Sequence, residues 1–70
     1  MDKIVQAMAD EMAANFFRVY IMKGDTDLRW SMECEYRQGH DEHLTPVIGY
    51  GATVEAAIIN TYAAWKKIDL

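Results

Sequence analysis

The residues that could do chemistry are few, and their densest group is the run His40, Asp41, Glu42 and His43. Imidazole, carboxylate and thiolate groups bind zinc, and Cys34 is the single thiol of the chain. A structural zinc site needs four ligands in tetrahedral geometry, whereas this run offers two His in a polar turn and one Cys on the strand before it. The pattern favours a solvated turn, and we predict neither a metal nor a cofactor.

Residues for acid–base or nucleophilic catalysis are equally sparse. Cys34 could act as a nucleophile with His40 or His43 as its base, but its place on the inward side of a strand favours a buried, inert thiol. Glu33 and Glu35 share one side of that strand and could form a carboxylate pair. A domain of 70 residues offers little room for a catalytic pocket. We therefore expect that the protein is not an enzyme.

The charge of the chain is concentrated in its middle. The net charge is −4, and the segment 24–45 contains six acidic residues against two arginines. A surface of this sign repels phosphate and attracts cations. The expected partner is therefore a protein with a basic surface, and nucleic acid is not expected. The acidic residues of the segment are Asp25, Asp27, Glu33, Glu35, Asp41 and Glu42.

Length and composition indicate one small domain over residues 1–70. With 51% hydrophobic residues the chain can form a core, but a marginal one, so self-association or a partner is a reasonable expectation. The lone Cys34 cannot form an internal disulfide, which fits a reducing compartment. No apolar run approaches the ~18 residues of a membrane span, and no leader pattern is present. We expect a cytoplasmic protein that does not enter a membrane.

Two amphipathic helices are predicted at the ends of the chain. Apolar residues recur at spacings of three and four over residues 2–15, where Asp2 is suited to the N-cap, and again after Thr53, which is suited to the N-cap of the second helix. The predicted stripes are Met1, Val5, Met8 and Met12 in the first helix, and Val54, Ala57, Ile58, Thr61, Trp65 and Ile68 in the second.

Three strands are predicted between the helices. Residues 16–23 are rich in β-branched and aromatic types, and residues 28–37 alternate between apolar and polar types throughout. Residues 44–50 contain Pro46, which lacks an amide donor and suits an edge strand. Polar turns separate the strands, with Gly49 and Gly51 relaxing the backbone after the third. The predicted fold class is α+β, in the order helix, three-stranded antiparallel meander, helix.

The two faces of this predicted sheet differ in character. If both helices cover the face of Phe17, the other face exposes Phe16, Tyr20 and Met22 beside the two glutamates of the second strand. Clustered apolar residues on a half-covered sheet suggest a contact surface. One helix on each face is the alternative. The predicted inward residues are Phe17, Val19, Ile21, Leu28, Trp30, Met32, Cys34 and Tyr36.

The order of elements, with Gly49-Tyr50-Gly51-Ala52-Thr53 leading into an alanine-rich last helix, resembles the double-stranded RNA-binding domain in outline. The resemblance implies RNA binding through lysines at the start of that helix. Here the matching segment 53–57 is neutral to acidic, and phosphate binding requires Lys or Arg. The segment 51–57 is also similar to the helix entry of HicB-like antitoxin domains.

In size, acidity and scarcity of cysteine the chain resembles accessory proteins of phages and mobile elements, including anti-CRISPR proteins. The leading hypothesis is an inhibitor or regulator that presents carboxylates to a basic groove and competes with nucleic acid for it. One alternative is a nucleic-acid-binding module that uses Arg18, Arg29, Arg37, Lys66 and Lys67. Another is a homodimer or scaffold module that pairs through the sheet face or the strand 16–23. The predicted partner-binding residues are Asp25, Asp27, Glu33, Glu35, Asp41, Glu42, Phe16 and Tyr20.

Overall fold

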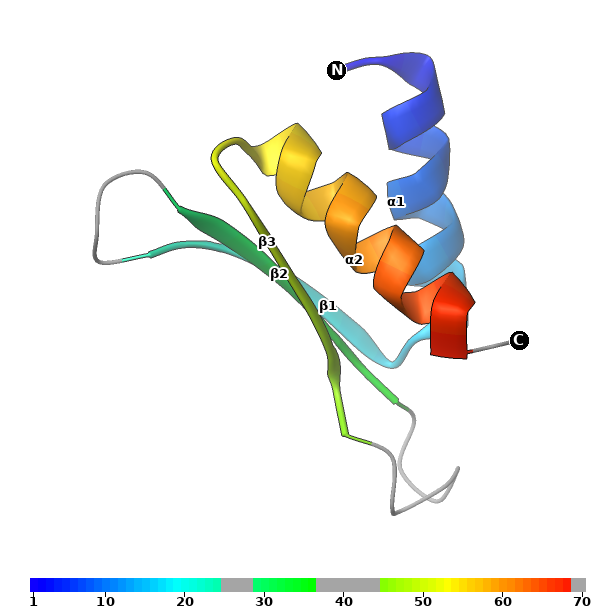
Figure 1. Ribbon diagram of the computed structural model, residues 1–70. Helices are drawn as coiled ribbons and strands as arrows, with labels where there is room; N and C mark the ends of the chain where they lie inside the picture. Colours follow the sequence, from blue (N-terminus) through cyan, green and yellow to red (C-terminus); the bar gives the residue numbers. More distant parts are fainter. Residues whose placement is uncertain (25–28, 37–44, 69–70) are drawn as a thin grey trace.

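A computed structural model of the chain describes residues 1–24, 29–36 and 45–68. Both of its helices lie on the same side of a three-stranded sheet (Figure 1). The predicted α+β order of helix, antiparallel meander and helix is confirmed, and of the two arrangements considered the one with both helices on one face is correct. The elements are α1 (Lys3–Asn15), β1 (Arg18–Lys23), β2 (Trp30–Glu35), β3 (Val47–Gly51) and α2 (Val54–Ile68).

Side-chain caps mark the starts of both helices. Asp2 Oδ1 accepts a hydrogen bond from the Ile4 amide (2.7 Å), and Thr53 Oγ1 accepts one from the Ala56 amide (3.1 Å). Each bond satisfies an amide that has no partner within the first helical turn. At its other end α1 stops at Phe16, whose backbone is extended and directs the chain toward β1. Both predicted N-caps are confirmed.

The strand order is β1-β2-β3, so β2 is central and β3 is an edge strand, as predicted. Pro46 stands immediately before β3 rather than within it. Alternating side chains give the sheet two faces. The covered face, on the side of the helices, consists of Val19, Ile21, Lys23, Trp30, Met32, Cys34, Val47, Gly49 and Gly51. The helices do not reach the far end of β1, so Ile21 (43% exposed) and Lys23 remain exposed, and the prediction that Ile21 is an inward core residue is wrong. The open face consists of Arg18, Tyr20, Met22, Ser31, Glu33, Glu35, Ile48 and Tyr50.

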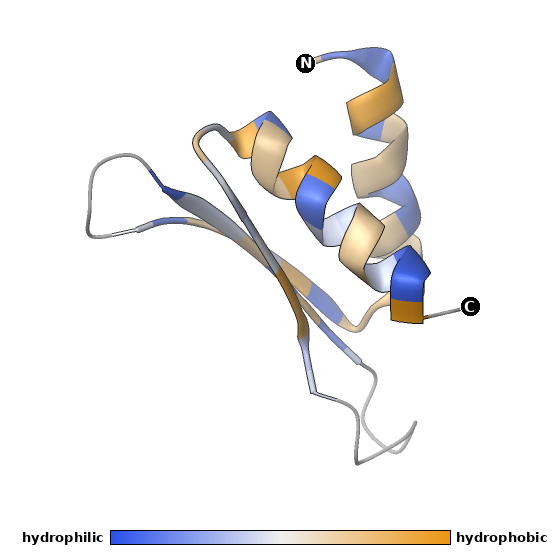
Figure 2. Ribbon diagram, viewed as in Figure 1, coloured by the Kyte–Doolittle hydropathy of each residue, from blue (hydrophilic) through white to orange (hydrophobic). Residues whose placement is uncertain are grey.

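The core lies between the covered face and the helices. Hydrophobic and hydrophilic residues are interspersed along both helices (Figure 2). This is the pattern of an amphipathic helix, which buries only one of its sides. The Thr61 hydroxyl is buried but satisfied, because it donates to the Ala57 carbonyl at 2.7 Å. The largest fully buried side chains are Met12, Met32, Cys34, Ile58 and Thr61.

The two glycines of β3 allow α2 to lie directly on the sheet. A Cβ atom at Gly49 would stand 2.5 Å from the Thr61 amide nitrogen, and one at Gly51 would stand 2.5 Å from that of Ala57. Contacts this short with backbone atoms cannot be relieved by rotating a side chain. Neither glycine has a φ in the left-handed region. Their role is therefore close approach between a strand and a helix, not the relaxed backbone that the sequence suggested.

The positions of Phe16 and Phe17 are the reverse of those predicted. Phe16 is 3% exposed and packs edge-on against Tyr36 and Trp65, with ring centroids 5.1 and 5.2 Å apart, whereas Phe17 is 53% exposed. The cause is that β1 begins only at Arg18, so both phenylalanines lie in the connection from α1. The strand alternation does not extend to them. Phe16 belongs to the core, and its predicted place on the open face is wrong.

The predicted helical stripes are buried only in part. In α1, Val5 and Met12 are buried, but Met1 precedes the helix and is exposed, and the start of this helix lies far from the sheet (Figure 1). In α2 the stripe is buried from Ala57 to Trp65, whereas Ile68, the last helical residue, is exposed. Among the described residues, neither helix is long and apolar enough to cross a membrane.

Candidate binding surface

The groups considered for catalysis or metal binding do not form a site in the described part of the chain. The run from His40 to His43 lies outside the described residues. Within residues 1–24, 29–36 and 45–68, no three His, Cys, Asp or Glu residues come together as a metal site would require. Cys34 is fully buried with its Sγ 3.9 Å from Met12 Sδ. Burial, aided by the nearby Glu33 carboxylate, raises the pKa of this thiol to about 11, so it is protonated at neutral pH.

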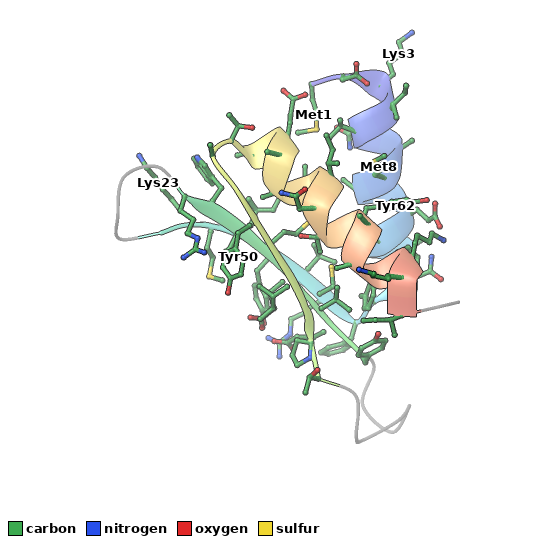
Figure 3. All side chains as sticks on the ribbon, viewed as in Figure 1. Met1, Lys3, Met8, Lys23, Tyr50 and Tyr62 are labelled. Atoms are coloured by element: carbon green, nitrogen blue, oxygen red, sulfur yellow. The ribbon has the colours of Figure 1, made fainter. Side chains whose placement is uncertain are left out.

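The open face is the surface that the helices leave uncovered. Met22 is 48% exposed, Ile48 41% and Tyr50 47%. Tyr50 projects from β3 away from the two helices (Figure 3). Across the strands Tyr20, Glu33 and Ile48 form one row, and Met22, Ser31 and Tyr50 form the next. The face thus combines apolar and aromatic side chains with a carboxylate at its centre.

Glu35, at one end of the open face, already has partners within the chain. Arg18 lies directly across from it, with Arg18 Nε 3.6 Å from Glu35 Oε2. The Arg18 guanidinium also lies over the Tyr20 ring, 5.7 Å from its centroid. Partial desolvation raises the pKa of Tyr20, and the hydrogen bond to Glu35 raises it further. Arg18, Tyr20 and Glu35 therefore form one connected group.

Glu33, two residues earlier on β2, is different. Its cross-strand neighbours are Tyr20 and Ile48, neither of which is charged. Among the described residues no Lys or Arg lies within ion-pair distance of it. Arg29, at the other end of β2, instead stacks over the Tyr50 ring at 4.3 Å. Glu33 is thus a partly buried carboxylate without a described counter-ion.

The predicted partner-binding residues are brought together only in part. Glu33, Glu35 and Tyr20 share the open face, and Phe16 is in the core. Asp25, Asp27, Asp41 and Glu42 lie outside the described residues. The described open face carries two glutamates and one arginine, and Arg29 from just before β2 lies over its Tyr50 ring, so the face is not itself strongly acidic. The predicted partner-binding residues do not include Met22, Ile48 and Tyr50. Ile48 and Tyr50 alternate along the third strand with Val47 and Gly49, and this alternation could have indicated that they lie on the open face.

A second polar group joins the two helices on the other side of the molecule. Glu11 of α1 accepts hydrogen bonds from the Tyr62 hydroxyl (2.9 Å) and from Lys66 Nζ (2.7 Å), both on α2. Lys66 Nζ also lies 4.2 Å from the Trp65 ring centroid. The bonds from Lys66 and Tyr62 lower the pKa of Glu11. These contacts link α1 to α2. They also involve Lys66, one of the cations that the nucleic-acid-binding alternative would use.

Comparisons of the chain with protein-family models, with curated proteins and with solved structures find no match.

Proposed function

We propose that this protein is a small protein-binding inhibitor or regulator, and that it holds a partner with a basic surface against the open face of its sheet. The observation that carries the proposal is the exposure of Met22, Ile48 and Tyr50 around Glu33 on a face that neither helix covers. Apolar and aromatic side chains that surround few charges are typical of the centre of a protein interface.

The net charge of −4 supports a basic partner, because complementary charge steers association and disfavours wrong partners. A basic surface that normally holds nucleic acid would be blocked by such a protein. This mode of action agrees with the resemblance in size and acidity to phage and mobile-element accessory proteins of the anti-CRISPR type.

The nucleic-acid-binding alternative has less support. At the start of α2, where the double-stranded RNA-binding domain has lysines, this chain has Thr53 and Glu55. Lys66, near the other end of α2, is bound to Glu11. Phosphate binding would need several unneutralised cations on one surface.

A homodimer formed by stacking two open faces also has less support. Three strands about 4.8 Å apart and roughly 20 Å long offer a footprint of roughly 300 Å², whereas a stable interface buries about 800 Å² on each partner. A second copy docked flat on this face would bury too little area. A larger partner can extend past the edges of the sheet.

Affinity capture from cells in which the gene occurs tests the proposal. Wild-type protein is compared with Glu33→Arg and with Glu55→Arg, an equal charge reversal on the exposed side of α2. We expect a basic protein that wild type and Glu55→Arg retain and that Glu33→Arg loses, with capture weakening as salt is raised. Circular dichroism should show all three variants folded. Equal capture by all three would exclude the open face as the binding surface.

A further inference from the structure

Glu33 and Glu35 stand on the same strand and face, but only one of them is available to a partner. Glu35 interacts with Arg18 and Tyr20, so a partner's cation would have to displace an existing contact. Glu33 has no described cation beside it and lies in the row between Tyr20 and Ile48. A partly desolvated carboxylate gains more from an incoming cation than a fully hydrated one does.

The open face also shows which cation fits it. Its two tyrosine rings each have an arginine over them, Arg18 at Tyr20 (5.7 Å) and Arg29 at Tyr50 (4.3 Å). Guanidinium is planar and weakly hydrated, so it lies flat against aromatic and aliphatic groups while its N–H donors reach a carboxylate. The lysine ammonium is a compact and strongly hydrated charge, and it is less suited to a site with apolar neighbours.

From this arrangement we infer that the partner contributes one arginine side chain to the centre of the open face, bound by Glu33 and flanked by Tyr20 and Ile48. The inference rests on the proposed function and specifies what the partner presents. Recognition at this point is by a single guanidinium with apolar contacts around it, rather than by a general attraction between an acidic and a basic surface. Glu33 is then the residue whose loss matters, and Glu35 is not.

A titration with model peptides tests the inference without the partner. The probes are Ac-Gly-Arg-Gly-NH2, the lysine peptide of the same length, and the citrulline peptide, which keeps the shape of arginine without its charge. The readout is the backbone and side-chain chemical shifts of the labelled protein. We expect arginine to shift the signals of Glu33, Tyr20 and Ile48 with millimolar affinity, lysine to bind at least threefold more weakly, and citrulline to have no effect. Glu33→Gln should weaken arginine binding at least fivefold, and Glu35→Gln less than twofold.

Several results would overturn the inference. These are an equal response to lysine and arginine, a response to citrulline, an equal loss in the two glutamine variants, and no localised shift with any peptide. The spectra themselves report whether each variant is folded. Failure of the proposed function is a separate result, because it requires that Glu33→Arg still captures the partner. If the titration fails and Glu33→Arg nevertheless loses the partner, the open face remains the binding surface and only the arginine assignment is wrong.

Discussion

The covered and open faces belong to the same three strands, yet their tolerance to change should differ sharply. Met32 on β2 is buried against the helices, whereas the next residue, Glu33, points to the other side. On β3 the buried Gly49 contacts α2, whereas Ile48 and Tyr50 on either side of it are exposed. Residues buried against the helices therefore alternate along β2 and β3 with residues that the helices leave uncovered. We therefore expect substitutions on the open face to leave the domain folded, and substitutions at buried positions of the covered face, such as Met32 and Gly49, to destabilise it.

The largest expected effect is at Gly49, where the covered face meets the backbone of α2. Gly49→Ala places a Cβ 2.5 Å from the Thr61 amide nitrogen, so the helix must move away from the sheet. We expect a loss of about 3 kcal/mol or more in the free energy of unfolding, as for severe overpacking. That is a large part of the roughly 4–10 kcal/mol typical of a domain of this size. Urea denaturation measures the change.

Gly24→Ala is the control, because the added Cβ would stand 3.2 Å from the Arg29 carbonyl, away from α2. Its effect should be clearly smaller. If Gly49→Ala were as stable as wild type, α2 would not lie on β3 as closely as described.

An intermediate effect is expected from truncating one apolar residue on each face. Met32→Ala removes a fully buried side chain and leaves a cavity beneath α2, which should cost about 3 kcal/mol. Ile48→Ala, on the open face, should cost less than about 1 kcal/mol. Thermal and urea unfolding of the two variants give the values directly. Similar losses from both would mean that the open face is covered in solution, for example by a second copy of the chain.

The smallest effect concerns the contact between the helices that cover the sheet. Hydrogen bonds from Lys66 and Tyr62 lower the pKa of Glu11 below its ordinary value of 4.5. The ionised carboxylate therefore stabilises the fold above that value, and the stabilisation is lost as the pH falls through the lowered pKa of the folded state. The melting temperature of wild type should exceed that of Glu11→Gln at pH 6, and the difference should shrink toward pH 3.

Lys66→Met supplies the control for this last prediction. In that background Glu11→Gln should lower the melting temperature less, because Lys66, the partner that lowers the pKa of the carboxylate most, is gone. A pH-independent difference between wild type and Glu11→Gln would show that the Glu11 contacts with Lys66 and Tyr62 are too weak in solution to influence folding.

The amino-acid sequence by itself determined the features that depend on neighbours along the chain. Helical spacing and the capping residues Asp2 and Thr53 located both helices, and alternation along residues 28–37 assigned Met32 and Cys34 to the covered face and Glu33 and Glu35 to the open face. Caps and alternation are local, since each follows from the geometry of a single element.

Only the tertiary structure decided what each element packs against. Whether both helices share one face depends on how α1 packs beside α2, which no residue pattern specifies. Because β1 begins only at Arg18, Phe16 lies in the core and Phe17 is exposed. Because α2 packs closely on β3, Gly49 is the position where a side chain would collide with the helix backbone. The pairing of Arg18 with Glu35, which distinguishes Glu35 from Glu33, likewise required the register between two strands. Such contacts join residues that are far apart in the chain, so no local sequence pattern predicts them. The candidate site depends on these contacts.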